Sequence, residues 1–283
     1  LPTPVGEEIG TIIEEPDALN DYVDFLKSTI NVDLKGLKIA VDCANGAAYM
    51  AGPKVLEALG AELIVTGSEP NGCNINKNCG STHIEALQEI VKANKVDLGL
   101  AFDGDADRCL AVDENGNLVD GDQIMAICGL QMKKENTLTG NTIVATVMSN
   151  LGLFIMAEKN GINVEKTKVG DRYVLEEMLK EGYNLGGEQS GHIIFLDHNT
   201  TGDGLVTAVN LLKVMAETGK PLSELKKVMQ VYPQVLLNVE VEDKSKYDGN
   251  EAILAAVNKA KEALGEKGRI VVRPSGTEPI IRV

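Results

Sequence analysis

Short apolar segments that resemble β-strands alternate with helical segments along most of this chain, and the alternation runs twice. Strands are expected over 38–41, 62–65, 98–102 and 109–112, and again over 142–145, 163–166 and 193–196. Helices are expected over 17–30, 83–94, 121–133, 149–160, 172–181 and 203–217. Both copies follow the order strand, asparagine-containing turn, helix, strand. Because such alternation is typical of largely parallel sheets covered by helices, it predicts duplicated α/β domains.

The pattern changes near residue 231. A strand is expected over 235–241, a helix over 249–264 and a further strand over 269–272. The predicted fold is α/β, with two related three-layer α/β/α domains whose sheets are mixed and largely parallel, and a smaller, truncated C-terminal α+β domain. The expected segments are a linker and helix at 1–34, domains at 35–136 and 137–230, and the incomplete third domain at 231–283.

Composition restricts the partners of the chain. The formal net charge is −15, and a field of this sign repels nucleic acid and anionic membrane, so neither is expected to bind. An anionic substrate would need local cationic pockets. No apolar run approaches the ~20 residues that span a bilayer. Five cysteines form no metal-type pair, and the odd count favours a reducing cytosol, which predicts a cytoplasmic protein. Cys43, Cys109 and Cys128 are expected in the core.

The strongest local motif is Asp-Gly-Asp-Ala-Asp-Arg at 103–108, directly after an expected strand. The carboxylates of Asp103, Asp105 and Asp107 can converge on one hard cation if the loop curls around it. Without a counter-ion, their mutual repulsion would be costly. Oxygen-only ligands favour Mg²⁺ or Ca²⁺ over Zn²⁺, and the adjacent Arg108 suggests an anion beside the ion. A solvated acidic turn is the plainer alternative.

An EF-hand is a sharper alternative for the same motif. Asp103, Asp105, Asp107 and Glu114 fall at ligand positions of its twelve-residue loop. The sixth position, however, needs a glycine and holds Arg108. The flanking segments are also expected to be strands, whereas an EF-hand needs helices on both sides. A metal-binding loop between two strands is therefore the preferred interpretation.

A second candidate loop, Arg273-Pro274-Ser275-Gly276-Thr277, follows an expected strand. Pro274 and Gly276 favour a tight turn. The guanidinium, the two hydroxyls and the glycine amide of this segment can together face one phosphate. Taken alone, such a segment is more often only a turn.

Two more loops carry polar groups suited to a phosphorylated sugar. In 187–192, Glu188 can accept two sugar hydroxyls, Ser190 can donate or accept, and His192 can be a polar contact or a proton carrier. A polar hairpin with a satisfied histidine is the alternative.

In 168–172, Lys168 stands at the carboxyl end of an expected strand, where it can reach into a crevice. The following helix N-terminus and Arg172 favour a nearby anion. A simple N-cap by Asp171, with solvated cations around it, is the alternative.

Taken together, these loops resemble the α-D-phosphohexomutase superfamily, most closely its bacterial glucosamine branch. The matching motifs are DGDADR (103–108), KVGDRY (168–173), GEQSGH (187–192), TTGDG (200–204) and RPSGTEP (273–279). VDCANGA (41–47) and PNGCNIN (70–76) are similar to the glucosamine rather than the mannose or glucose branch. The likeness covers essentially the whole chain. One departure is Ala106, where the family usually has glycine, and alanine should be tolerated if φ is negative there.

The resemblance implies an isomerase that interconverts glucosamine 6-phosphate and glucosamine 1-phosphate through a phosphoserine and a bisphosphorylated intermediate, in amino-sugar and cell-wall precursor synthesis. It places Mg²⁺ on Asp103, Asp105 and Asp107, which makes 35–136 the metal-binding domain. The implied substrate contacts are Glu188, Ser190 and Arg172 in the sugar-binding domain, and Arg273, Ser275, Gly276 and Thr277 in the phosphate-binding domain. Arg108 would pair with the transferring phosphate, and Lys168 and His192 are both candidates for proton transfer or electrostatic support.

The family carries its phosphoserine in a Ser-His-Asn loop of a first domain, and no Ser-His-Asn occurs in this sequence. The expectation is therefore a chain that lacks this domain, stops before the family's C-terminal end and has no turnover alone. The expected partners are a phosphorylated amino sugar and, for assembly, a homodimer. The alternatives are a mannose- or glucose-specific enzyme of the superfamily, or a non-catalytic module that binds phosphosugar or Ca²⁺.

Overall fold

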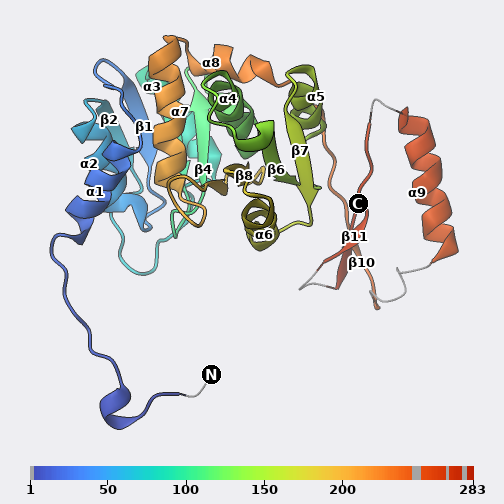
Figure 1. Cartoon of the computed structure of the whole chain (residues 1–283), viewed down its shortest axis with the longest axis horizontal. Coiled ribbons are helices and arrows are strands. Elements are labelled where there is room, and N and C mark those ends of the chain that lie inside the picture. Colours follow the sequence, from blue (N-terminus) through green and yellow to red (C-terminus); the bar gives the residue numbers. More distant parts are fainter. Residues whose placement is uncertain (1–2, 244–249, 266–267, 276–278) are drawn as a thin grey trace.

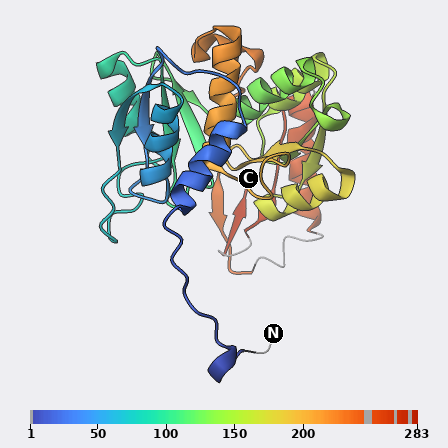
Figure 2. The same ribbon diagram turned by 60° about the vertical axis from the view of Figure 1, so that its left-hand side comes forward.

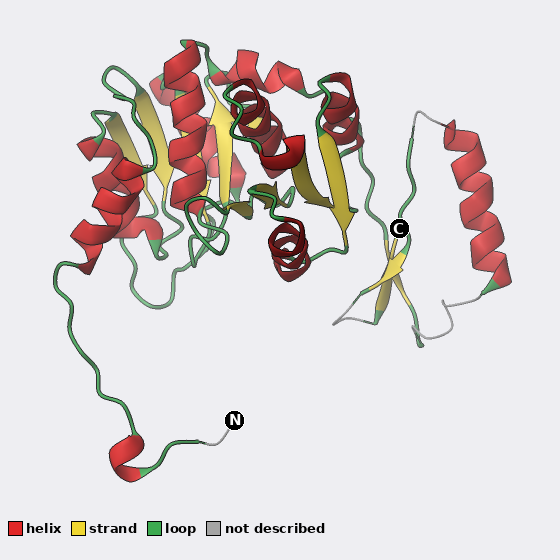
Figure 3. Cartoon of the chain, viewed as in Figure 1, coloured by secondary structure: helices red, strands yellow, loops and turns green. Residues whose placement is uncertain are grey.

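A computed structural model of the chain describes residues 3–243, 250–265, 268–275 and 279–283. Figure 1 shows two sheets side by side, each with helices against it, and a smaller C-terminal unit of strands and one helix beyond the second sheet. The same layering of strands between helices is visible in Figure 3. The expected fold class is confirmed.

The first sheet has the strand order β2-β1-β3-β4-β5. Its strands are β1 (Lys38–Asp42), β2 (Glu62–Thr66), β3 (Leu98–Phe102), β4 (Cys109–Asp113) and β5 (Leu118–Val119). β1 pairs in parallel with β2 and β3, and β4 is antiparallel to β3 and to β5. Helices α2 (Ala48–Ala58) and α3 (Ile84–Asn94) make the crossovers. β3 and β4 are buried along their whole length, as expected for strands covered on both faces.

The second sheet has the order β7-β6-β8-β9. Its strands are β6 (Thr142–Thr146), β7 (Asn163–Thr167), β8 (Leu185–Gly187) and β9 (Ile193–Phe195), and its crossover helices are α5 (Leu151–Lys159) and α6 (Asp171–Glu181). β6 is parallel to β7 and β8, and β9 is antiparallel to β8. The order and the directions match those of β2-β1-β3-β4, which supports the duplication expected from the sequence.

The helix that follows each sheet reaches across to the other one. α4 (Gly121–Lys134) follows the first sheet but packs on β8 and α5 of the second. α7 (Gly204–Thr218) follows the second sheet and packs against β9, β4 and α2, and also against α1 (Ala18–Ser28). Figure 2 shows α7 between the two sheets. One buried apolar cluster consequently runs through both units, from Ile39 to Leu212.

The C-terminal unit consists of β10 (Asn238–Glu240), α9 (Glu251–Leu264), β11 (Arg273–Pro274) and β12 (Ile280–Arg282), with strand order β10-β12-β11. The strand expected over 235–241 is shorter, although Leu237 still exchanges backbone hydrogen bonds with Val283 at 2.8 and 2.9 Å. The strand expected over 269–272 is wrong, since 268–272 are irregular. The remaining short helices are η1 (Gly6–Glu8), η2 (Thr139–Asn141), α8 (Leu222–Leu225) and η3 (Lys226–Val228).

Cys43, Cys109 and Cys128 are buried free thiols, as expected from their apolar surroundings. Among the described residues, no helix combines the length and the apolar character needed to cross a bilayer.

Candidate metal and anion site

The acidic loop and the 188–192 loop occupy equivalent positions in the two sheets. Residues 103–108 join β3 to β4, and residues 188–192 join β8 to β9. The two loops meet, because Arg108 and His192 form an antiparallel bridge and the Cys109 amide donates to the Gly191 carbonyl at 3.1 Å. The duplicated topology thus brings together two motifs that lie about eighty residues apart in the sequence.

Two glycines at helix starts lock these loops reciprocally. Gly121 begins α4 and donates its amide to the Gln189 carbonyl at 3.0 Å, while Gly204 begins α7 and donates to the Ala106 carbonyl at 2.9 Å. A Cβ on Gly121 would lie 2.2 Å from the Glu188 carbonyl oxygen, and one on Gly204 would lie 2.6 Å from that of Arg108. Only glycine permits these close backbone approaches.

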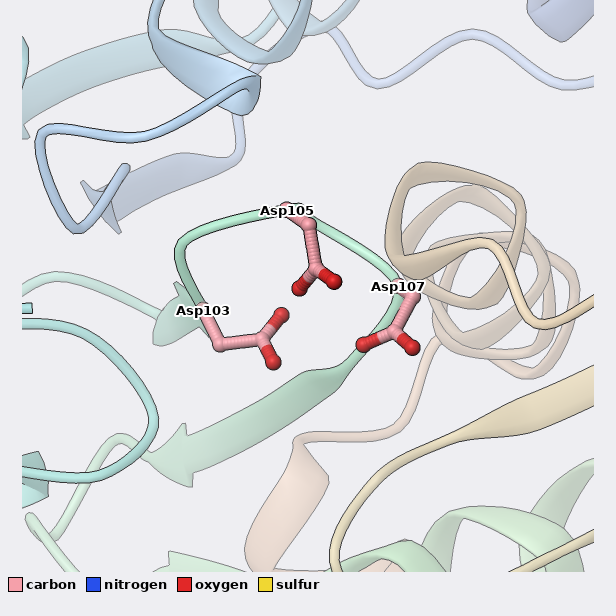
Figure 4. A group of neighbouring side chains, drawn as sticks. All are labelled: Asp103, Asp105 and Asp107. Atoms are coloured by element: carbon pink, nitrogen blue, oxygen red, sulfur yellow. The ribbon is translucent and has the colours of Figure 1, made fainter. Parts of the chain in front are cut away.

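The carboxylates of Asp103, Asp105 and Asp107 face a common space (Figure 4), and one oxygen from each lies within 4.8 Å of the others. Arg108 holds the Asp103 carboxylate in place, since its amide donates to Asp103 Oδ1 at 3.1 Å and its Nε lies 3.5 Å from Asp103 Oδ2. β-strands flank the loop on both sides, which excludes the EF-hand alternative.

Electrostatics favour a cation at this place. Burial, together with the charges of Asp107 and Asp105, raises the pKa of Asp103 to about 6. Asp107 Oδ1 is buried and has no hydrogen-bond partner among the described residues. Three convergent carboxylates, one of them destabilised in its ionised form and one with an unsatisfied oxygen, fit a hard divalent ion.

The segments 41–47 and 70–76 hold the acidic loop from the side of the first sheet. The Ala47 amide donates to the Gly104 carbonyl at 2.9 Å, and a Cβ on Gly46 would lie 2.3 Å from the same oxygen. The Asn76 amide donates to the Ala44 carbonyl at 2.9 Å. These two motifs therefore support the acidic loop structurally.

Ala106 does not have the expected backbone conformation. Its φ is +61°, in the left-handed region that favours glycine, whereas a negative φ had been the condition for tolerating alanine. The Asp103 carbonyl accepts the Ala106 amide at 3.1 Å, so Ala106 closes a turn centred on Gly104 and Asp105, and the loop holds alanine in the left-handed region at a cost.

Replacing Ala106 with glycine is expected to stabilise the chain. A left-handed alanine costs roughly 1–2 kcal/mol, and the extra freedom of glycine in the unfolded chain offsets about 0.4–1 kcal/mol of this gain. Urea denaturation should therefore show a net increase of about 0.5–1 kcal/mol in the free energy of unfolding. The same change at Ala51, inside α2, should instead lower it by about 1 kcal/mol. Equal losses in both variants would contradict strain at Ala106.

His192 lies next to Asp107 of the acidic loop. Its side chain is 4% exposed, and its Nε2 is 3.6 Å from Asp107 Oδ2 and 4.0 Å from Asp171 Oδ2. Gly202 covers the imidazole so closely that a Cβ there would lie 2.2 Å from Nε2. The imidazole is therefore enclosed between Asp107 and Gly202.

The 168–172 loop joins the site through Glu188, whose Oε1 accepts the Gly170 amide at 2.9 Å. Lys168 is exposed and lies over the Tyr173 ring, 5.8 Å from its centroid. Arg172 instead follows its own helix, with its Nε 2.7 Å from Glu176 Oε1 and its side chain 80% exposed.

Ser190 is exposed at the tip of its loop. The N-cap expected from Asp171 is wrong, because Asp171 is the first residue of α6 and Gly170 is the N-cap. Gly170 has a φ of 128°, which glycine adopts readily.

The described residues of the fourth predicted loop, Arg273 to Ser275, do not lie at the acidic loop. Arg273 lies in β11 and Ser275 is buried just after it, with its amide donating to the Ile280 carbonyl at 2.9 Å. Figure 1 shows β10 and β11 beyond α5 and β7, on the side away from the first sheet. Gly276 and Thr277 lie outside the described residues. Three of the four expected loops therefore converge, whereas Arg273 and Ser275 lie in the separate C-terminal unit.

The motif at 200–204 had no residue assigned to a role, yet it shapes the site. Asp203 caps α7 by accepting the amides of Leu205 and Val206 at 3.0 Å, and its carboxylate also accepts the Tyr22 hydroxyl at 2.8 and 2.9 Å. Asp203-Gly204 and Asp120-Gly121 are matching Asp-Gly pairs at helix starts, and that repeated pair is the signal from which they could have been found.

Paired α/β/α units with a three-carboxylate loop at their junction define an α/β protein with a candidate divalent-metal site. The sequence matches three domains of the phosphoglucomutase/phosphomannomutase family. Residues 20–116 match alpha/beta/alpha domain II, residues 120–232 match alpha/beta/alpha domain III, and residues 236–283 match the C-terminal domain. The chain belongs to this family. The domain III match begins at 120 and so includes α4, in agreement with the packing of α4 on the second sheet.

Relatives of known name are similar over the whole chain. A phosphoglucosamine mutase of Acetivibrio thermocellus is 61% identical, with 99% of this chain and 63% of that protein covered. One of Brevibacillus brevis is 57% identical, with 100% of this chain and 63% of that protein covered. The chain thus spans just under two thirds of the length of these relatives.

Solved structures show the same fold at low identity. A family protein of Burkholderia thailandensis has a TM-score of 0.78 at 23% identity, covering 93% of this chain and 59% of that one. Aspergillus fumigatus N-acetylphosphoglucosamine mutase, in complex with GlcNAc-6P and magnesium, has a TM-score of 0.75 at 20% identity, covering 93% and 60%.

Proposed function

We propose that this chain forms the metal- and sugar-binding part of a phosphoglucosamine mutase, which interconverts glucosamine 6-phosphate and glucosamine 1-phosphate. The observation that carries the proposal is the bridge between Arg108 and His192, which joins a three-carboxylate loop to the loop of Glu188. The named relatives at 57–61% identity support the glucosamine branch over the mannose and glucose branches.

Mg²⁺ is the proposed cofactor, held by Asp103, Asp105 and Asp107. When bound, it would neutralise charge on a transferring phosphoryl group. The chain's own contribution is to hold the three carboxylates together before the ion arrives, at the cost of their repulsion. Arg108, which braces Asp103, also supplies a positive charge beside the ion for the same phosphate.

The sugar is proposed to lie between the loop of Glu188 and the loop of Lys168. One oxygen of Glu188 is used by the Gly170 amide, and the other is available for sugar hydroxyls together with the exposed Ser190 hydroxyl. Lys168 is exposed and is the proposed proton-transfer group. His192 is buried beside Asp107 and is proposed to hold that carboxylate in place. A role for Arg172 would require its guanidinium to leave Glu176.

Arg273, Ser275, Gly276 and Thr277 are proposed to bind the phosphate that does not react. Arg273 Nε is buried and lacks a hydrogen-bond partner among the described residues, which is consistent with a group that receives an anion. The substrate would then extend from its phosphate at the C-terminal unit to its sugar at the loops of Glu188 and Lys168. A homodimer stays a prediction that sedimentation can test.

Calorimetry with the 283-residue chain tests the proposal. Glucosamine 6-phosphate should bind in the presence of Mg²⁺, and more tightly than mannose 6-phosphate or glucose 6-phosphate. Preference for either of the latter would support the mannose or glucose branch instead. Tight Ca²⁺ binding without any effect of Mg²⁺ or sugar phosphate would favour a non-catalytic module and overturn the proposal.

The affinity for Mg²⁺ is expected to depend on pH through Asp103. The ion binds the ionised carboxylate, and the metal-free pKa of Asp103 is raised to about 6 by burial. Affinity should therefore be level above about pH 7 and fall roughly tenfold per pH unit below about 6. Titrations from pH 5 to 8 at constant ionic strength measure this, and an affinity that stays constant down to pH 5 would contradict it.

A polypeptide of these 283 residues is expected to show no turnover of glucosamine 6-phosphate. Transfer in the proposed reaction needs a serine that carries the phosphoryl group, and the Ser-His-Asn loop implied by the resemblance is not among these residues. A coupled assay for glucosamine 1-phosphate measures this, and conversion above the no-protein background would contradict it.

A further inference from the structure

Another buried carboxylate, Asp122, lies in the first turn of α4, next to the loop of Glu188. Its neighbour Gly121 donates to the Gln189 carbonyl at 3.0 Å, and the Asp120 carboxylate accepts the Gln189 side-chain amide at 3.0 Å. Asp122 itself has no exposed surface, and its Oδ2 accepts the Asn150 amide at 2.6 Å. The turn therefore contacts the loop of Glu188 on one side and the turn after β6 on the other.

Asn150 also binds the segment that leads to the C-terminal unit (residues 235–283). Its side chain makes two hydrogen bonds with the Tyr232 backbone, since Oδ1 accepts the Tyr232 amide at 3.0 Å and Nδ2 donates to the Tyr232 carbonyl at 2.9 Å. Gln234 adds a bond to the Met148 carbonyl at 3.1 Å and one from the Gln189 side chain at 3.3 Å. Asn150 Nδ2 also lies 3.4 Å from Gln234 Oε1, so five hydrogen bonds fix residues 232–234 against the second sheet.

Arg269, from the C-terminal unit itself, ends on the same turn. Its Nη2 donates to the Ser149 carbonyl at 2.5 Å, and its guanidinium lies over the Phe154 ring, 5.1 Å from the centroid. Its charge also acts on Asp122. Burial raises the pKa of Asp122 to about 7, against the opposing effect of the Asn150 amide, and the repulsion of Asp120 adds to the rise.

Nothing in the proposed catalytic roles uses Asp122, Asn150 or Arg269, yet both connections to the C-terminal unit converge on residues 149–150. We infer that the Asp122 carboxylate is a positioning group that holds this turn and thereby sets the C-terminal unit, with Arg273, relative to the loop of Glu188. The inference rests on the proposed function in assigning the two phosphosugar contacts to these two places. The Asp122 carboxylate supplies an acceptor for a buried amide that would otherwise be unsatisfied.

Hydrogen exchange tests the positioning without any ligand. Asp122→Ala should speed exchange of the Tyr232 amide at least tenfold, because the turn that presents Asn150 loses its support. Asp122→Asn keeps an acceptor for the Asn150 amide and should stay within about threefold of the unchanged chain. Asp42→Ala is the matched control, since Asp42 is equally buried and holds the corresponding turn of the first sheet through the Ala44 amide. It should leave the Tyr232 amide unchanged.

Binding measurements test the consequence. Asp122→Ala should weaken glucosamine 6-phosphate about tenfold while the Mg²⁺ affinity stays within twofold, and Asp122→Asn should restore the sugar affinity. Asn150→Ala, which cuts the next link, should act like Asp122→Ala if the latter fails to fold. Unchanged Tyr232 exchange, or faster exchange with unchanged sugar affinity, would overturn the inference. If the unchanged chain binds no sugar phosphate, the proposed function fails and the exchange experiment alone decides the positioning.

Discussion

Asp103→Asn is expected to abolish tight Mg²⁺ binding while making the metal-free chain more stable. The change removes one of three charges and one of the oxygens that would hold the ion, so calorimetry should show a loss in affinity of at least about 100-fold. The Arg108 backbone amide, which donates to Asp103 Oδ1, can donate to the side-chain oxygen of the asparagine instead. The rest of the loop should therefore change little.

The gain in stability follows from the same pKa shift. The folded-state pKa of Asp103 is raised from 3.8 to about 6, so ionising it costs folding free energy as the pH rises between those values, and the full cost is present above pH 6. Metal-free Asp103→Asn should therefore exceed the unchanged chain by about 1–3 kcal/mol at pH 8, and the difference should vanish below about pH 4.

Asp97→Asn is a matched control for this variant. It removes the same charge at the other end of β3, where Asp97 accepts the Lys38 amide at 2.8 Å on the surface. The Mg²⁺ affinity should not change there. If Asp103→Asn kept its affinity for Mg²⁺, the acidic loop would not be the metal site.

Gly121→Ala is expected to destabilise the chain and weaken its binding of sugar phosphate together. The added Cβ would lie 2.2 Å from the Glu188 carbonyl and 2.8 Å from the Gly191 amide, both of them backbone atoms that cannot swing aside. Such overpacking costs about 1–3 kcal/mol or more, and relief of the clash must displace the loop of Glu188. Urea denaturation and calorimetry with glucosamine 6-phosphate should show both losses.

Gly204→Ala and Gly52→Ala make the test specific. Gly204→Ala should displace the acidic loop instead, because its Cβ would lie 2.6 Å from the Arg108 carbonyl, and its main loss should be in Mg²⁺ affinity. Gly52, inside α2, has no atom nearer than 3.5 Å to its added Cβ, so alanine there should be neutral or stabilising by up to about 1 kcal/mol. Similar losses in all three variants would contradict the reciprocal locking of the two loops.

Much of the fold could be predicted because its signals are local. The strands β1, β3 and β6 are short apolar runs bounded by turns, and their predicted limits agree with the structure to within one residue. The acidic loop could be found for the same reason, since its three carboxylates are adjacent in the sequence. β5 and β8 were missed because two or three residues carry too little periodicity.

What could not be predicted depends on contacts between distant segments. The crossing of α4 onto the second sheet, the bridge from Arg108 to His192 and the glycine contacts of Gly121 and Gly204 arise only when two sheets pack together. The left-handed backbone of Ala106 was missed because alanine rarely adopts it. The distance of Arg273 from the acidic loop likewise depends on how the C-terminal unit packs, which no motif encodes.

The proposed function requires a metal ion and a sugar phosphate to be bound side by side. Mn²⁺ can report this directly, because it accepts the same oxygen ligands as Mg²⁺ and is paramagnetic. With Mn²⁺ bound to the chain, the ³¹P resonance of added glucosamine 6-phosphate should broaden strongly, and Asp103→Asn should abolish the broadening at the same total Mn²⁺. A narrow ³¹P line in the presence of protein-bound Mn²⁺ and saturating glucosamine 6-phosphate would show that the acidic loop and the sugar phosphate do not share a site.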